Sequence, residues 1–480
     1  MSRVDRRKFL KRSLAMAGAT FAISGTKSSG QIIGANETIH MGVAGLHGRG
    51  GSHVSAFSGM KDVRIIYLID VDSRTFKGHA KRLEEKYGSA PKTVQDVRKA
   101  LEDKDLDAIS IATPNHWHSL MTIWGCQAGK DVYVEKPLSH NVHEGRIAVE
   151  TARKYNRMVQ HGTQGRSGNI GIVIQELVKQ GSYGKLLIAR GLCYKRRATI
   201  GFKEPKEPPP EVDFDIWLGP APKQPYHENL VHYNWHWFWD FGDGDIGNQG
   251  VHEMDKARWG IPGGILPKSV LSVGGRFGYT DQGQTPNTQI AVLDYGDTQL
   301  MFEVRGLPSD KYYDESIGDT YHFEKGVVAG GKFYPDGKGE GEKMPNLDIK
   351  RKSGGDHFAN FIAAVRSRKI EDLNADVLEA HLSCVPIHLA NISYRLGDEV
   401  AFKPRTNAFG DNKAAYDALE RMEEHLVKNG VKLEDAKLRV GKRLTFDPAT
   451  EKFVGEGSDK ANEMLTRKYR PPFVVPDKVV

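Results

Sequence analysis

Cysteine is scarce in this sequence, which has only three cysteines in 480 residues. Cys126, Cys193 and Cys384 are odd in number and widely spaced, which argues against a disulfide framework. The chain also lacks an internal repeat. A composition that is 39% hydrophobic and 27% charged is neither disordered nor fibrous. It predicts a soluble globular protein of two domains, stabilised by the packing of its cores.

A basic stripe that could track phosphates is also missing, despite a net charge of +7 and a pI near 9.0. The first twelve residues carry six basic side chains and one acidic side chain, which account for five of the seven charges. The remainder is close to neutral and shows no run of like charge. We therefore expect no nucleic-acid partner.

The N-terminal apolar stretch, residues 13–23, is too short to span a membrane, so we expect no stable membrane insertion. It follows the segment Asp5-Arg6-Arg7-Lys8-Phe9-Leu10-Lys11, which matches the twin-arginine signal R-R-x-F-L-K. Its glycine- and alanine-rich composition gives it no polar face, which argues against an amphipathic anchor. Residues 1–34 therefore predict export to the periplasm, with the cleavage site left open. Because that pathway carries folded proteins, the signal also predicts a bound cofactor.

From residue 35 to 160 short β-rich runs alternate with amphipathic helical stretches, which is typical of an α/β fold with a parallel sheet. The predicted strands are Ile39–Gly45, Val63–Asp70, Leu106–Thr113 and Asp131–Lys136. The predicted helices begin after Gly50 and then span Arg74–Tyr87, Trp117–Ala128 and Val142–Tyr155. The strand runs are rich in Val, Ile, Leu and Ala, as strands covered on both faces require.

The pattern changes after residue 160, and residues 161–433 are predicted to form a second domain with a mainly antiparallel sheet. Its predicted strands are Lys185–Arg196, Ser269–Arg276, Thr288–Tyr295 and Gln299–Arg305, and its helices are Ile170–Gln180, Asp356–Arg368 and Val377–Leu396. Residues 201–222 and 330–343 are predicted loops. Residues 434–480 form an extension, interpreted either as an arm over a neighbouring copy or as a disordered terminus.

The first predicted strand runs into Gly45-Leu46-His47-Gly48-Arg49-Gly50, which resembles the G-x-G-x-x-G turn with His47 at the second glycine. In such a turn Gly45 makes the tight bend and Gly50 lets the helix pack close to the strand. The middle position allows the backbone to approach a diphosphate. His47 adds a Cβ there, and the adjacent Gly48 restores some room. The turn, with Arg49 included, is a predicted cofactor contact, although it also fits a simple strand-to-helix connection.

Asp70 ends the next strand twenty residues beyond Gly50, where a carboxylate accepts hydrogen bonds from ribose hydroxyls. That spacing favours NAD, because a carboxylate repels the 2′-phosphate of NADP. Arg74 lies one turn further on and softens the preference, which leaves NADP open. Asp72 competes for the ribose role, with the cap of the following helix as its alternative role.

Two further segments lie at the ends of neighbouring buried strands, where ligands bind in open parallel sheets. One is Glu135-Lys136-Pro137, and the other includes Thr113, Pro114, Asn115 and His116. Lys136 can donate to a substrate oxygen, and its pKa falls in a dry pocket. A salt bridge between Glu135 and Lys136 is disfavoured, because neighbours in a strand point to opposite faces.

A glycine-rich stretch in the second domain leads to Asn248 and His252 at the start of a helix. His252 could shuttle a proton during hydride transfer, although a lone histidine is more often a cap or a packed side chain.

The aromatic run at residues 232–240 is a predicted sugar site, because aromatic faces stack on the C–H faces of sugars. We assign substrate contacts to His232, Trp235 and His236, with core packing as the alternative for each tryptophan. Gln164 is predicted to lie near the nicotinamide and Arg166 near the substrate, and a polar loop is the alternative for both. His381, Cys384 and His388 share a helix face, but their apolar neighbours favour packing, and no metal site is predicted.

Taken together, these motifs resemble the Gfo/Idh/MocA family of oxidoreductases over nearly all of the chain after residue 34. The glycine turn, Asp70 and Glu135-Lys136-Pro137 match the family's nucleotide motifs, and its D-x-x-x-H pair maps to Asn248 and His252. The resemblance implies a Rossmann NAD(P)-binding domain, a C-terminal α/β domain with an open sheet, and a cis Lys136–Pro137 bond. It also implies that Lys136 and His252 surround the reacting C–OH group, and that copies pair through the open sheet.

Two departures matter, namely His47 and Asn248, which stands where many members have an aspartate. Asn248 can orient a hydroxyl group but cannot act as a base, so proton transfer falls to His252 or Lys136. We expect an NAD(P)-dependent oxidoreductase acting on a carbinol of a sugar, cyclitol or sugar derivative, with a tightly bound cofactor. The alternatives are an NAD-dependent glycosidase that works through a transient keto-sugar and a non-catalytic cofactor-binding protein.

Overall fold

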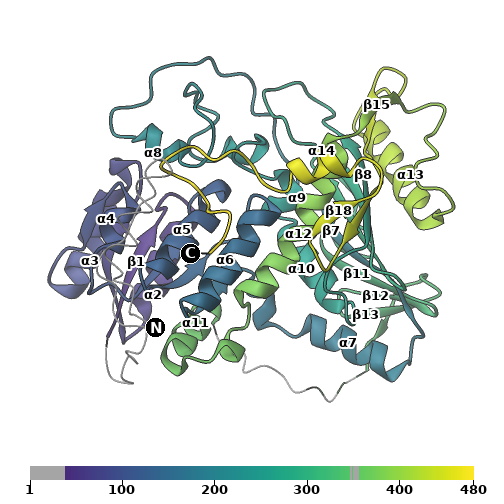
Figure 1. Ribbon diagram of the computed structural model, residues 1–480. Helices are drawn as coiled ribbons and strands as arrows, with labels where there is room; N and C mark the ends of the chain where they lie inside the picture. Colours follow the sequence, from purple (N-terminus) through teal and green to yellow (C-terminus); the bar gives the residue numbers. More distant parts are fainter. Residues whose placement is uncertain (1–37, 346, 348, 350–355, 480) are drawn as a thin grey trace, which may run out of the picture.

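The computed structural model describes residues 38–345, 347, 349 and 356–479, which form two sheets with a layer of helices between them (Figure 1). The predicted twin-arginine signal lies outside the described residues and stays a prediction. In the part of the chain that is described, no helix is both long enough and apolar enough to cross a bilayer.

The first sheet has the strand order β3-β2-β1-β4-β5-β6, and every neighbouring pair is parallel. This is the strand order of a Rossmann fold, whose ligand crevice lies where the order reverses, beside β1 and β4. The strands are β1 Ile39–Ala44, β2 Val63–Ile69, β3 Lys92–Val94, β4 Ala108–Ile111, β5 Asp131–Val134 and β6 Val159–His161. The helical segments are α2 Arg49–Gly59, η1 Ser73–Thr75, α3 Phe76–Tyr87, α4 Val97–Leu101, α5 Asn115–Gln127 and α6 Val142–Lys154. The four strands predicted from the sequence are thus confirmed.

The second sheet is mixed, since β7 and β10 are parallel neighbours while its other pairs are antiparallel. Its path is β14-β13-β12-β11-β7-β10-β9-β8-β16-β15; off this path, β17 pairs with β8, and β18 pairs with β17. The strands are β7 Leu186–Cys193, β8 Ser269–Gly275, β9 Thr288–Asp294, β10 Gln299–Arg305, β11 Ile317–Phe323, β12 Gly326–Ala329, β13 Lys332–Pro335, β14 Glu342–Lys343, β15 Asp398–Ala401, β16 Lys437–Val440, β17 Leu444–Asp447 and β18 Lys452–Val454. The predicted loop at 330–343 is therefore partly wrong, because Phe333 and Tyr334 are buried in a strand of this sheet.

The remaining helical segments are η2 Gln164–Ser167, α7 Ile170–Gln180, α8 Phe214–Leu218, η3 Asn234–Trp237, α9 Gly244–Asn248, α10 Val251–Gly260, α11 His357–Ser367, η4 Ile370–Asp372, α12 Val377–Arg395, α13 Lys413–Lys428 and α14 Ser458–Glu463. One apolar core runs through both domains and includes residues of α5, α6, α10 and α12. Helix α11 returns to the first domain, where Phe358 stacks on Tyr133 with ring centroids 4.8 Å apart. All three cysteines are buried and free.

The segment after α14 crosses from the second sheet to the Rossmann domain and ends beside α5 and α6 (Figure 1). Its Phe473 is almost fully buried against Trp117 and Trp124 of α5, at centroid distances of 5.4 and 6.4 Å. Arg470 Nη1 donates to Asp215 of α8 over 2.8 Å. Both interpretations of the extension are thus replaced, because β16 to β18 join the second sheet and residues 465–479 lie against their own chain. We call residues 465–479 the C-terminal belt.

Replacing Phe473 with alanine should lower the free energy of unfolding by about 3 to 5 kcal/mol, because the lost ring leaves a cavity against two tryptophans. Phe202→Ala is the matched control, since Phe202 is 63% exposed and should change stability by less than about 0.5 kcal/mol. Urea denaturation followed by tryptophan fluorescence measures both. Equal stabilities of the two variants would show that the belt does not stabilise the fold.

Candidate active site

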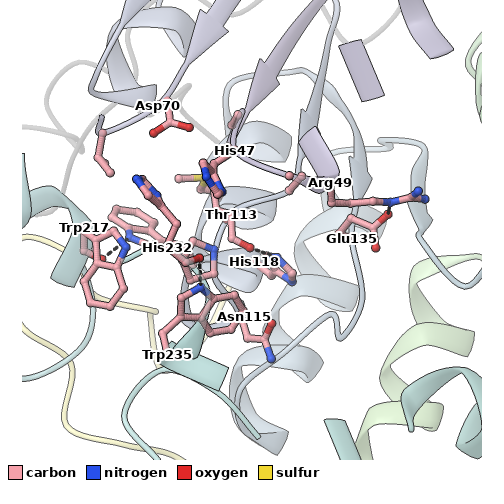
Figure 2. Close-up of a pocket in the computed structure, with 18 of the residues that line it drawn as sticks. His47, Arg49, Asp70, Thr113, Asn115, His118, Glu135, Trp217, His232 and Trp235 are labelled. Carbon is pink, nitrogen blue, oxygen red and sulfur yellow. Dashed lines mark hydrogen bonds and ion pairs between the residues drawn. The ribbon is translucent and has the colours of Figure 1, made fainter. Parts of the chain in front are cut away.

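A cleft of about 360 Å³ opens at the carboxyl ends of β1, β2, β4 and β5, between the Rossmann domain and the segment that holds α8 and η3. Figure 2 shows Asp70 and His47 on one side of it, with Trp217, His232 and Trp235 on the other. The sequence-predicted residues that line this cleft are Gly45, His47, Gly48, Arg49, Asp70, Thr113, Pro114, Asn115, Glu135, Lys136, His232, Trp235, His236 and Asn248.

The glycine turn has the close packing that its sequence predicts. A Cβ on Gly45 would lie 2.5 Å from the carbonyl oxygen of Ala112, and a Cβ on Gly50 would lie 1.6 Å from that of Gly45. Gly48 has a φ of +69° and faces open space. It therefore leaves space for a ligand beside the second fingerprint position, where His47 carries a side chain. No side chain caps the start of α2 among the described residues, so the backbone N–H groups there are available to an anion.

Asp70 is buried at the end of β2 and lines the cleft. Its carboxylate accepts hydrogen bonds from Leu46 N at 2.6 Å and Asp72 N at 2.9 Å, and it thereby fixes the glycine turn. Burial raises the pKa of Asp70, and these two N–H groups oppose that shift. Asp72 caps the helical turn that follows and binds Arg74 through two side-chain nitrogens, at 2.8 and 2.6 Å.

His47 meets the second domain across the cleft. Its ring stacks on His232 with centroids 4.3 Å apart and an angle of 12° between the planes. His232 Nε2 in turn lies 2.9 Å from Asp72 Oδ2. Burial, and next the neighbouring His232, lowers the pKa of His47. The histidine that departs from the fingerprint thus contacts a predicted substrate residue and closes one side of the cleft.

Several lining residues were missed by sequence reasoning, chiefly Ile216 and Trp217 of α8 and Gln95 and Val97 beside β3. Trp117 Nε1 donates to the carbonyl oxygens of Ile216 and Trp217, at 3.0 and 3.1 Å, which holds α8 against α5. Residues 201–222 were predicted to be a loop, and the available signal was the apolar group Ile216, Trp217 and Leu218 after the prolines.

Glu135 and Lys136 do not pair with each other, as the strand geometry predicted. Glu135 Oε1 accepts from Arg49 Nε at 2.8 Å and lies 3.0 Å from His53 Nε2. Burial alone would raise the pKa of Glu135, but His53 and Arg49 hold that pKa well below its usual range. Lys136 Nζ instead donates to the carbonyl oxygen of Asn248 at 2.7 Å. The Lys136–Pro137 bond is cis.

The second domain brings Asn248, His252 and His236 toward this lysine. Asn248 ends α9 and lines the cleft, while His252 lies one turn further along, in α10. Burial and then the charge of Lys136 lower the pKa of His252 to about 3, so the ring is neutral near pH 7. Burial likewise lowers the pKa of Lys136 itself. The site therefore combines the neutral imidazole of His252 with the amino group of Lys136, whose charged form is disfavoured by burial.

Six predicted site residues do not line the cleft: Gly50, His116, Pro137, Gln164, Arg166 and His252. Gln164 lies just behind it, with Nε2 3.4 Å from Glu135 Oε1. The ring of His116 is buried against Trp217, with Nε2 2.9 Å from the Trp217 carbonyl oxygen, so this side chain packs behind the cleft and does not line it. His381 and His388 have different partners, Glu451 and Asp243 respectively.

Arg166 also needs a correction, because its guanidinium is buried in an ion pair with Asp255, at 2.8 Å, and not directed to a substrate. Ser383 Oγ donates to the same carboxylate at 2.6 Å, so Asp255 is fully engaged between η2, α10 and α12. The polarity of residues 162–166 gave no means to distinguish a buried ion pair from a binding loop.

The cleft fits a dinucleotide on its own geometry. Gly45 and Gly50 leave no room for side chains, Gly48 faces open space, and Asp70 stands at the end of β2. Thr113 Oγ1 is buried and has no hydrogen-bond partner among the described residues, which suits a group that enters the cleft.

Two family models match the two domains in order. Residues 39–163 match the oxidoreductase family's NAD-binding Rossmann fold, and residues 191–262 match its C-terminal alpha/beta domain. The chain thus matches the Gfo/Idh/MocA oxidoreductase family in both domains. The resemblance drawn from the sequence is confirmed at this level.

Among curated proteins, "Glycosyl hydrolase family 109 protein 2" of Shewanella sp. strain ANA-3 is 30% identical over 210 residues, which are 39% of this chain and 45% of that protein. An "Alpha-N-acetylgalactosaminidase" of Shewanella oneidensis is 27% identical over the same shares. The matched region thus spans less than half the length of these relatives.

Among solved structures, the WlbA dehydrogenase from Bordetella pertussis, in complex with NADH and UDP-GlcNAcA, has a TM-score of 0.54 at 18% identity. It covers 74% of this chain and 96% of its own. An oxidoreductase from Thermotoga maritima has a TM-score of 0.52 at 17% identity and covers the same shares. At these identities the likeness shows the shared fold alone.

Replacing Arg166 with methionine should lower the free energy of unfolding by about 3 to 5 kcal/mol, because the buried Asp255 would lose its ion-pair partner. Lys442→Met, which removes the exposed pair with Asp398, should cost less than about 1 kcal/mol. Chemical denaturation measures both values. If Arg166 instead contacted the substrate, the Arg166→Met variant would have normal stability and a raised KM.

Proposed function

We propose that this chain is an NAD-dependent oxidoreductase that acts on a carbinol carbon of a sugar, cyclitol or sugar derivative and retains its cofactor between turnovers. The observation that carries the proposal is the convergence of the glycine turn, Asp70 and Lys136 on one cleft. The family-model matches to an NAD-binding domain and its partner domain support it.

When bound, the nicotinamide supplies a hydride acceptor. Lys136 Nζ, which already donates to the Asn248 carbonyl oxygen, would bind the substrate hydroxyl oxygen. His252 lies one turn beyond the cleft-lining Asn248, and burial and the charge of Lys136 keep its ring neutral. Its free nitrogen would accept the hydroxyl proton as the hydride leaves, since Asn248 cannot act as a base. Glu135 would fix the backbone around Lys136 by binding Arg49 and His53 on the other side.

The choice of NAD over NADP is supported by the state of Arg74. The sequence left this arginine as a candidate partner for a 2′-phosphate, but its guanidinium binds Asp72 through two nitrogens. The buried Asp70 lines the cleft, and Arg49, the cation that the turn adds to the lining, is bound to Glu135. A phosphate at the ribose would meet a carboxylate and no available guanidinium.

Glycoside cleavage is the second candidate, and the glycosyl hydrolase names of the curated relatives favour it. In that reaction the same residues would oxidise a sugar transiently to a keto-sugar. The oxidation acidifies the neighbouring C–H bond, and elimination then expels the aglycone and leaves an unsaturated keto-sugar. Water would add across the new double bond, and the hydride would return to the ketone carbon. The cofactor ends as it began, so cleavage proceeds without net NADH.

Export through the twin-arginine pathway, a periplasmic location and homo-oligomerisation remain proposals that follow from the sequence. Export supports a retained cofactor, because the periplasm offers little free NAD. The interdomain stack of His47 on His232 beside the glycine turn supports retention independently.

Replacing His232 with alanine should speed dissociation of NAD by about one to two orders of magnitude, since the stack on His47 and the contact with Asp72 are lost. His40→Ala, at the opposite end of β1, is the matched control and should retain the cofactor. Mass spectrometry of the purified proteins and stopped-flow fluorescence give the two readouts. Wild-type protein purified from the periplasm without nicotinamide would contradict retention.

Replacing Lys136 with methionine should lower turnover at least about 100-fold while NAD stays bound, because the hydroxyl oxygen loses its donor. The control is Lys81→Met, whose side chain is 77% exposed on α3. Exchange of deuterium at a carbinol carbon reports oxidation, and aglycone release without NADH accumulation reports cleavage. Sugar binding with neither reaction in the wild type would favour a non-catalytic protein.

A further inference from the structure

A second cleft, of about 420 Å³, lies where the end of the aromatic run meets the end of α12 and strand β16. Trp239, from the run that also supplies Trp235 and His236 to the candidate active site, forms one wall of it. Since Trp239 follows His236 by three positions, their Cα atoms are at most about 11 Å apart. A short oligosaccharide spans that distance.

Basic side chains dominate the lining of this second cleft. Arg276, Arg395, Lys437 and Arg439 line it, against a single carboxylate, Glu399. Arg439 Nη2 donates to Glu399 over 2.8 Å, and Arg276 Nε donates to Asp281 over 2.7 Å. Arg395 and Lys437, by contrast, form no ion pair among the described residues, and the charges of Asp240 and Asp243 reach Arg395 only from outside the lining. The lining itself therefore keeps more positive than negative charge.

The aromatic side chains hold these cations in place and add apolar surface. The Arg395 guanidinium carbon lies 5.0 Å from the centroid of the Trp239 ring, and that of Arg439 lies 5.7 Å from the Tyr394 ring. The two rings are tilted by 42°, with centroids 6.4 Å apart. Gln284 Oε1 accepts from Trp239 N at 2.9 Å and fixes the tryptophan backbone.

Each component suits one class of ligand. Guanidinium groups bind planar anions through two parallel hydrogen bonds. An arginine that forms no ion pair has these donors available for a ligand. Aromatic rings stack on the C–H faces of sugar rings. A ligand that carries both an anionic group and a sugar ring uses the whole cleft.

We propose that this second cleft binds an anionic sugar unit, a uronate or a sulfated sugar, of a substrate whose reacting sugar lies in the candidate active site. Arg395 and Lys437 contact the anionic group, and Trp239 contacts the ring. The choice of a saccharide rests on the proposed function, whereas the choice of an anion rests on the charges of this cleft alone.

The test is isothermal titration calorimetry of the full-length protein with three oligosaccharides of equal length. They are an oligogalacturonate, a chondroitin sulfate fragment and an uncharged cello-oligosaccharide. We expect at least one anionic ligand to bind about tenfold or more tightly than the neutral one, with the two anionic arms distinguishing carboxylate from sulfate. Equal affinity for all three would overturn the proposal.

Arg395→Gln and Trp239→Ala should each weaken anionic binding by about tenfold, and Arg64→Gln, on β2 of the other domain, should leave it unchanged. Arg395→Lys keeps the charge but not the paired donors, so its affinity for the anionic ligand should lie between those of the wild type and Arg395→Gln. This variant replaces Arg395→Gln in the test if the glutamine variant is unstable. Anionic binding that is indifferent to Arg395 and Trp239 would overturn the proposal.

Assays of NAD content and Lys136-dependent chemistry on the same protein separate the two ideas. Arg395-dependent binding in a protein that lacks this chemistry would support the second-cleft proposal and contradict the proposed function. Intact chemistry together with binding that does not depend on Arg395 would support the proposed function and contradict the second-cleft proposal.

Discussion

The contact on which the candidate site depends is the one between Glu135 and the pair Arg49 and His53. A carboxylate buried at the end of β5 is costly unless it is paired, and these two partners satisfy it from α2. Because Glu135 is satisfied there, its carboxylate forms no ion pair with the side chain of Lys136. Lys136 is left to reach across to the Asn248 carbonyl oxygen, which joins the chemistry of one domain to the backbone of the other.

At the other end of the cleft, two carboxylates close together in the chain also have different partners. Asp70 holds the glycine turn through Leu46, whereas Asp72 binds Arg74 and contacts His232. The end of β2 therefore fixes the glycine turn through Asp70, and the residues just after it hold the opposite wall of the cleft through Asp72. His47 occupies the gap between them, so the departure from the fingerprint becomes an interdomain contact and Gly48 takes over the open position.

The parallel sheet and the contributions of Gly45, Asp70 and Lys136 could be predicted because each depends on local sequence. Strand periodicity places residues at the carboxyl edge, and parallel strands bring those edges together. The covering residues Ile216 and Trp217 could not be predicted, since their position depends on contacts with Trp117 about a hundred residues away. Arg166 was misassigned for the same reason, because its partner Asp255 is distant in sequence. Helix α11 follows the second domain in the chain yet packs on Tyr133, which no periodicity reveals.

The C-terminal belt sets an order of events during synthesis. Residues 465–479 follow both sheets in the chain, and Phe473 must find Trp117 and Trp124 on a Rossmann domain that left the ribosome some 350 residues earlier. Until then α8, which Arg470 ties to the belt, lacks this anchor, so the wall that carries Trp217 is held less firmly. In a chain that is still being synthesised, the wall beside the nucleotide crevice would therefore form before it receives its tie from Arg470.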